Sequence, residues 1–363
     1  MLKGPESTLD SLYPQIAQVW HQQDDMVYSF DDRRYVHIES IWTFDLNDDL
    51  LRCDKQDCNL QIPLSLLRSR AVTMSDFEPY EPPTTSEPAL DSIFPPPCWR
   101  MKRKGLDSRR QARHMVFISR ILAEFALQWE YILGGRYNDA TFRKLASAVI
   151  RIATLDFDVE EIMAVRHRTG GGLVTWISHL PEWEPLRGNI FRVGGASIVM
   201  CQHIENAKAL IREDFEKRGI PQDPSRSSEQ SLTYLILSVK HVMLCRINWY
   251  TERYTTPKRL FDGTNPPSDE AVELLLEATQ TDPITTFISK FPTELQDLIL
   301  DFVSVGRIER ARVGCILDVG SNFRWEGADQ ETEREMEDGN RLPEIPVASH
   351  ICFGGRRSGV AYY

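Results

Sequence analysis

A long apolar stripe between residues 107 and 133 sets the strongest limit on the fold. Its large side chains recur at three- and four-residue spacing: Ile118, Ile121, Leu122, Phe125, Trp129, Ile132 and Leu133. Residues at this spacing lie on one face of an α-helix, and glycines 134 and 135 are a stop signal. The stripe predicts a long helix with one buried side, which other elements must cover.

Other segments alternate between helical and strand patterns. We expect helices over residues 8–22, 140–154, 202–218, 268–279 and 292–304, and a further helix that starts within 158–167. Strands are expected over residues 34–44, 173–180 and 191–200, and 231–250 is predicted to be one long strand or a broken pair. The mixture lacks a regular βαβ order. It favours an α+β fold in one large domain, with a Rossmann-like α/β core as the alternative.

The domain boundaries follow from composition. We expect a single catalytic domain over residues 1–325, and an acidic, partly flexible C-terminal tail over 326–363. The start of the chain lacks an apolar targeting segment, and no apolar run is long enough to cross a bilayer. Seven scattered cysteines are typical of reduced thiols. These features predict a cytoplasmic protein without a membrane segment.

Several common chemical motifs are missing from the sequence. It contains no phosphate-binding loop of the GxxxxGK[ST] type, no GxGxxG fingerprint and no GxSxG nucleophile motif. Its cysteines and histidines lack the paired spacing of a zinc site. We therefore expect no cofactor and no metal.

The first positive signal is the acidic pair Asp158 and Glu161, within the segment TLDFDVEEIM. On a helix, residues three apart share a face, so the two carboxylates would lie side by side. Such a pair binds a guanidinium or ammonium group, or accepts a proton from an attacking amine. A plainer interpretation is a helix cap, because an aspartate followed three residues later by a glutamate is a variant of the capping box.

The second signal is a cluster of basic residues that stands against a net charge of −11. The cluster contains seven bases: Arg100, Lys102, Arg103, Lys104, Arg109, Arg110 and Arg113. Basic clusters bind phosphate backbones through counterion release, so tRNA is the predicted ligand. The alternative is the solvated start of a helix.

Two weaker clusters are open to either interpretation. Glycine-rich turns near arginines, at residues 166–172 and 192–195, are able to hold a phosphate, but they are also typical of hairpin turns. Aromatic residues at 249–254 are able to line a pocket, although aromatics at a strand end more often belong to the edge of a core.

A further signal is the segment FPTELQDLILDFV at residues 291–303. It resembles the start of an F-box, in which an amphipathic helix binds a Skp1-like adaptor. The apolar face would consist of Leu295, Leu298, Ile299 and Phe302. Any capped amphipathic helix shows the same pattern.

The order of segments resembles the fungal arginine-containing cyclodipeptide synthases. The similarity rests on IPLSLLRSRAVTMSDFEPY (62–80), QWEYIL (128–133), TLDFDVEEIMAVRH (154–167) and FRVGGASIV (191–199), and spans roughly residues 30–310. That family has a DXXE motif, and Asp158–Glu161 is the one D-x-x-E in this chain. The F-box-like helix is a departure from the family pattern.

The resemblance implies a tRNA-dependent enzyme of secondary metabolism. It would join arginyl-tRNA and a second aminoacyl-tRNA into a diketopiperazine, cyclo(Arg-Xaa). The esters are already activated, so the reaction needs no ATP. Asp158 and Glu161 would divide two tasks, proton acceptance and guanidinium binding, in an order that the sequence leaves open.

Overall fold

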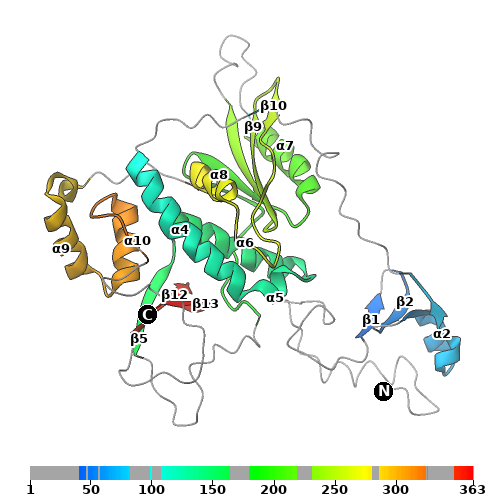
Figure 1. The fold of residues 1–363 in the computed structure, drawn as a ribbon. Coiled ribbons are helices and arrows are strands. Elements are labelled where there is room, and N and C mark those ends of the chain that lie inside the picture. The colour runs from blue at the N-terminus through cyan, green and yellow to red at the C-terminus, as the bar shows by residue number, and fades with distance from the viewer. Residues whose placement is uncertain are drawn as a thin grey trace.

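The computed structural model describes residues 41–45, 48–55, 58–81, 99, 108–163, 180–218, 231–279, 286–323, 325 and 347–362. The expected helix over 8–22, residues 173–179 of the expected strand over 173–180, the acidic stretch 326–346 and the glycine-rich turn at 166–172 lie outside these residues. The fold class is α+β, as predicted: helices accompany three separate sheets (Figure 1). The extent of a single domain over residues 1–325 remains a prediction.

The predicted long helix is confirmed as α4 (Ser108–Gln128), which continues into the short α5 (Glu130–Leu133) and ends at Gly134. The next helix, α6 (Asp139–Thr154), begins where the Asn138 side chain accepts a hydrogen bond from the backbone N–H of Thr141. This is an N-cap. The predicted stripes of both helices are buried in one core.

The central sheet has the strand order β10-β9-β8-β7-β6. The short strand β11 pairs with the first two residues of β9, His241 and Val242. The strands are β6 (Ile190–Val193), β7 (Ala196–Met200), β8 (Leu232–Leu237), β9 (His241–Ile247), β10 (Glu252–Tyr254) and β11 (Lys258–Arg259). Among these strands only β7 and β8 run parallel, so the Rossmann-like alternative is wrong. Of the two alternatives for residues 231–250, one long strand or a broken pair, the structure shows the pair, which is the β8–β9 hairpin.

Helices cover both faces of this sheet (Figure 1). On one face Ile198, Leu235 and Leu244 pack into the core that α4, α6 and α8 (Asp269–Thr279) share. On the other face Tyr234 and Met243 pack against α7 (Ala207–Lys217), which links β7 to β8 after the 3₁₀ helix η2 (Ile204–Asn206). The alternation of apolar side chains to both faces explains why these strands read as continuous apolar runs.

The predicted single strand over 191–200 is wrong, because the chain reverses inside it. Gly194, with φ of 55°, forms the turn between β6 and β7, which pair antiparallel from Val193↔Ala196 outward. A positive φ is readily adopted by glycine. The hairpin interpretation of this glycine cluster therefore holds at residues 192–195.

A second sheet, in the order β13-β12-β5, corrects two further predictions. Its strands are β5 (Asp158–Met163), β12 (Val347–Phe353) and β13 (Arg356–Tyr362). The helix expected to start within 158–167 is strand β5, because β12 supplies an antiparallel partner along its whole length. Residues 347–362, expected to belong to a tail, form a hairpin that packs Phe353 and Tyr362 into the main core.

The third sheet, in the order β1-β2-β3-β4, has a hydrophobic cluster of its own (Figure 1). Its elements are β1 (Ile41–Asp45), β2 (Leu50–Asp54), β3 (Asn59–Pro63), α2 (Leu64–Ser69), η1 (Met74–Asp76) and β4 (Glu78–Pro79). Part of the strand expected over 34–44 is thus observed. Leu51, Ile62 and Leu67 are buried in this small core.

The remaining described helices lie together at one side of the main body (Figure 1). They are the 3₁₀ helix η3 (Phe287–Lys290), α9 (Thr293–Val303) and α10 (Arg307–Leu317). Leu300 of α9 is buried where α9 and α10 meet, and Ile308 and Cys315 of α10 join the main core. The helix predicted over 292–304 is confirmed.

Candidate functional site

The acidic pair Asp158 and Glu161 lies on strand β5 and not on a helix. Side chains three residues apart in a strand point to opposite faces of the sheet. Asp158 stands opposite Cys352 and Glu161 opposite Ser349 in the pairing with β12. The prediction of two carboxylates side by side is therefore wrong, and the two residues have different surroundings.

Glu161 contacts both β12 and the start of α10. Its Oε1 accepts a hydrogen bond of 2.6 Å from Ser349 Oγ. The same carboxylate lies against Gly306, the residue before α10, where a β-carbon would overlap it. A negative group at a helix N-terminus is favourable, because the unpaired N–H groups and the helix dipole are positive there. Glu161 therefore joins β5, β12 and α10.

Asp158 is exposed and accepts no hydrogen bond from the residues that the structure describes. Its charge interacts with that of Arg312 on α10. Hydrogen bonds to Glu309 raise the pKa of Arg312, and the nearby charges of Asp158 and Asp156 raise it further. Arg312 also donates 3.0 Å to the Leu155 carbonyl. Asp158 is thus a carboxylate open to a ligand, next to a cation that is already bound to protein groups.

The seven predicted tRNA-binding residues fall into three groups. Arg100, Lys102, Arg103 and Lys104 lie outside the described residues, and Arg109 and Arg110 lie on the first turn of α4. The structure corrects the prediction that Arg113 binds tRNA, because its side chain is only 10% exposed. It donates hydrogen bonds to the carbonyls of Gly314, Val319 and Gly320, at 3.3, 3.0 and 2.8 Å.

Through these contacts Arg113 stabilises the fold. Helix α10 ends at Asp318, which has a left-handed backbone, and carbonyl groups at a helix end lack partners within the helix. The Arg113 guanidinium supplies donors to this region and also pairs with Asp318 at 3.4 Å. It holds α4 against the end of α10, so it is not available to a tRNA phosphate.

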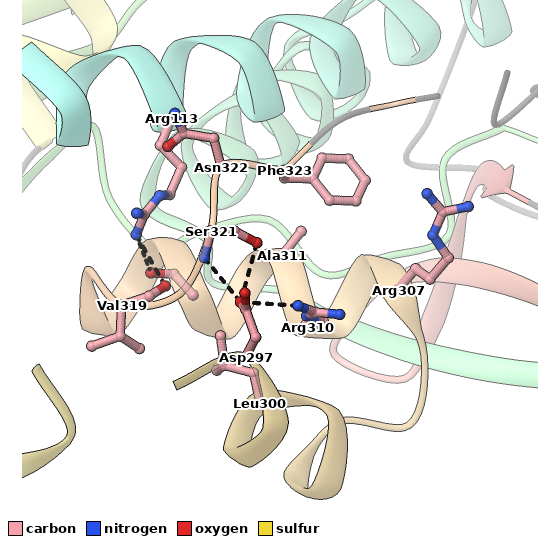
Figure 2. Close-up of a pocket in the computed structure, with 11 residues that line it drawn as sticks. Arg113, Asp297, Leu300, Arg307, Arg310, Ala311, Val319, Ser321, Asn322 and Phe323 are labelled. Carbon is pink, nitrogen blue, oxygen red and sulfur yellow. Dashed lines mark hydrogen bonds and ion pairs between the residues drawn. The ribbon is translucent and has the colours of Figure 1, made fainter. Parts of the chain in front are cut away.

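A cavity of about 540 Å³ opens between α4, α9, α10 and the segment that follows α10 (Figure 2). Its lining is Arg113, Asp297, Leu300, Arg307, Arg310, Ala311, Gly314, Val319, Ser321, Asn322 and Phe323. Its volume is in the range of ligand pockets.

Asp297 is the central polar group of this cavity (Figure 2). It accepts hydrogen bonds of 2.9 and 3.2 Å from Ser321 N and Oγ, and pairs with Arg310 at 2.9 Å. Burial acts to raise the pKa of Asp297, but these hydrogen bonds outweigh it and the pKa lies below its ordinary value. Asp297 is therefore an ionised carboxylate already bonded to protein groups.

The outer face of α9 is apolar and exposed. Leu295, Leu298 and Phe302 point away from α10, and Phe302 is 91% exposed. Ile299, which we placed on the same face, is half-buried. The F-box-like face is thus accessible to a partner along most of its length.

Helix α10 is the common neighbour of these features. Its start lies against Glu161, Arg312 lies near Asp158, its end receives Arg113, and α9 packs along it. Sequence reasoning missed Gly306, Ser349 and Arg312 as parts of the site. No local signal marks them, because each gains its contact from a segment far away in the chain.

No family model, curated protein or solved structure matches the chain. Within the described ranges, no group of three or more histidine, cysteine or acidic side chains is arranged to hold a metal ion. None of the helices in those ranges is long and apolar enough to cross a membrane.

Proposed function

We propose that the chain is a tRNA-dependent cyclodipeptide synthase that forms cyclo(Arg-Xaa) from arginyl-tRNA and a second aminoacyl-tRNA. The observation that supports this function best is that α10 contacts both the Asp158–Glu161 strand and the helix that carries the end of the basic run. Two segments that independently suggested carboxylate chemistry and tRNA binding are therefore connected through one helix.

The proposed reaction consists of two aminolysis steps. The α-amine of one aminoacyl group attacks the ester carbonyl of the other, an amide bond forms, and the first tRNA leaves with its 3′-oxygen protonated. The free amine of the dipeptidyl ester then attacks its own ester, which closes the six-membered ring and releases the second tRNA. Each step moves one proton from the amine to the departing oxygen, so a carboxylate that relays it accelerates the reaction.

We propose different parts for the two acidic residues. Asp158 is exposed and is the candidate for proton relay or for binding the substrate guanidinium. Glu161 is bonded to Ser349 and lies at the start of α10, so its proposed part is to position β5 relative to α10.

The tRNA backbone would bind along the basic run without Arg113. The proposed contacts are Arg100, Lys102, Arg103, Lys104, Arg109 and Arg110. We place the reaction in the cytoplasm, where both aminoacyl-tRNA substrates are made. No cofactor is proposed, because the ester bond carries the activation.

Metabolite profiling of a host that expresses the full chain tests the proposal. We expect an arginine-containing diketopiperazine with the parent chain and none with Asp158→Ala at equal soluble protein. Salt-dependent RNA binding without any such product would instead mean a binding protein. Absence of product in the presence of folded protein and both charged tRNAs would refute the synthase.

A second candidate function is an F-box-type adaptor without catalysis. The observation that favours it is the exposure of Leu295, Leu298 and Phe302 on α9, because such an apolar stripe is typical of a docking helix. A pull-down with a purified Skp1-like adaptor separates the two functions. We expect binding that Leu295→Asp abolishes, and no detectable binding at micromolar concentrations would exclude this candidate.

A further inference from the structure

The apolar surface on α9 is larger than the F-box-like segment. We call it the outer surface, and it consists of Phe287, Phe291, Leu295, Leu298, Phe302, Val303 and Val305, all of them exposed. Phe287 and Phe291 form an edge-to-face pair with ring centroids 6.0 Å apart. Clustered exposed apolar side chains mark interaction sites on soluble proteins.

The opposite side of α9 is firmly anchored, which holds the outer surface toward solvent. Leu300 is 3% exposed where α9 meets α10. Gln296 Nε2 donates 2.7 Å to the Phe291 carbonyl, and Gln296 Oε1 accepts 2.7 Å from the Gly320 backbone N–H. A simple rotation of α9 to bury Leu298 would break these contacts and expose Leu300. The exposed stripe is therefore a fixed feature of this packing.

The spacing of the outer surface fits a partner helix. On α9, Leu295, Leu298 and Phe302 follow one another at intervals of three and four residues, and Phe291 lies just before the helix begins. Apolar side chains at this spacing form the seam along which two helices pack, or with which a helix binds a groove.

The charges beside the seam argue against a second copy of this chain. Glu294 and Asp301 lie seven residues apart and border the same side of the stripe. In a two-fold antiparallel pair centred between Asp297 and Leu298, Glu294 of one copy would approach Asp301 of the other, and like charges at such positions are destabilising. The net charge of −11 adds repulsion between copies.

We propose that the outer surface binds an amphipathic helix of another protein, whose apolar stripe is bordered by lysine or arginine. The basic residues of the partner helix would pair with Glu294. They would also pair with Asp301, which already accepts a hydrogen bond of 2.6 Å from Arg310. This inference goes beyond the synthase and does not depend on it. It describes the partner chemistry that an adaptor function would also need.

Fluorescence anisotropy with two labelled synthetic peptides tests the proposal. Both peptides carry leucine at heptad positions a and d, and the flanking positions are lysine in one and glutamate in the other. We expect saturable binding of the lysine peptide to the full chain, weaker by at least tenfold for Leu298→Asp. Glu294→Lys should weaken the lysine peptide and strengthen the glutamate peptide.

Matched controls separate this site from general attraction to an acidic protein. Leu127→Asp changes an exposed leucine on α4, and Glu216→Lys reverses an exposed charge on α7. Both should bind the lysine peptide as the parent does, and circular dichroism should report the same fold for all four variants.

Three results would overturn the inference. They are equal binding of both peptides, equal binding by parent and Leu298→Asp, and a dimer in analytical ultracentrifugation that Leu298→Asp dissociates. The last result would identify a second copy as the occupant. Failure of a Skp1-like adaptor to bind would remove only the adaptor function, and loss of the diketopiperazine product would remove only the synthase.

Discussion

Replacement of Glu161 by alanine should destabilise the protein, whereas replacement of Asp158 should not. Glu161 loses the 2.6 Å bond from Ser349 Oγ and its contact with the start of α10. A hydrogen bond to a charged group contributes about 1.5–3 kcal/mol when buried. Glu161 is half-buried, so solvent screening reduces our expectation to about 1–2 kcal/mol.

This loss translates into a measurable change of melting temperature. For a domain of this size, 1 kcal/mol corresponds to about 2–4 °C, so Glu161→Ala should melt about 2–8 °C below the parent. Asp158→Ala removes an exposed side chain without a hydrogen bond from the described residues, and its effect should stay within about 0.5 kcal/mol. Thermal unfolding followed by circular dichroism at pH 7.5 measures both.

Glu161→Gln is the informative control. Its amide oxygen is still able to accept from Ser349 Oγ, but the negative charge at the start of α10 is lost, which costs about 0.3–1 kcal/mol. It should therefore melt between Glu161→Ala and the parent. The reasoning fails if Asp158→Ala lowers the melting temperature as much as Glu161→Ala does, or if Glu161→Ala melts with the parent.

Three further predictions follow from the same structure. Gly306→Ala should displace the Glu161 carboxylate and lower the melting temperature, and adding Glu161→Ala should cause little further loss, because both act on one contact. Arg113→Met should cost about 2–3 kcal/mol of stability through its lost carbonyl contacts; an unchanged melting temperature with weakened tRNA binding would contradict this. Burial lowers the pKa of His114 and of His350, so the unfolded chain binds their protons first and stability falls as the pH drops from about 6.5, by at most about 1.4 kcal/mol per pH unit per histidine. Urea unfolding at pH 7.5, 6.5 and 5.5 measures this slope, which His350→Gln should reduce.

The helices of the core were predictable because their information is local. The hydrogen bonds of a helix join residues four apart, and its buried face shows directly as a three- and four-residue period. The stripe that ends at Leu133 and the face of α6 are both buried as the pattern predicts. The β-branched run at residues 231–250 indicated strand, but it left one long strand and a pair equally open.

The strand β5 was not predictable in this way. A strand gains its hydrogen bonds from a partner that is distant in the chain, and here that partner is β12, which pairs Asp158 with Cys352 and Glu161 with Ser349. The local pattern of the segment equally fits a capped helix start. The C-terminal hairpin was not predicted either. Its strand β12 pairs with a segment distant in the chain, and the hairpin follows an acidic stretch that resembles the beginning of a tail.

The sequence alone therefore determined the α+β class, the main helices with their buried faces, and the apolar stripe of α9. Only the tertiary structure decided that Asp158 and Glu161 point to opposite faces, that Arg113 is bonded to carbonyl groups, and that Leu298 faces solvent. A side chain's type is local, but its neighbours come from segments joined by the fold. Which charges are bonded and which apolar groups remain uncovered depends on those neighbours.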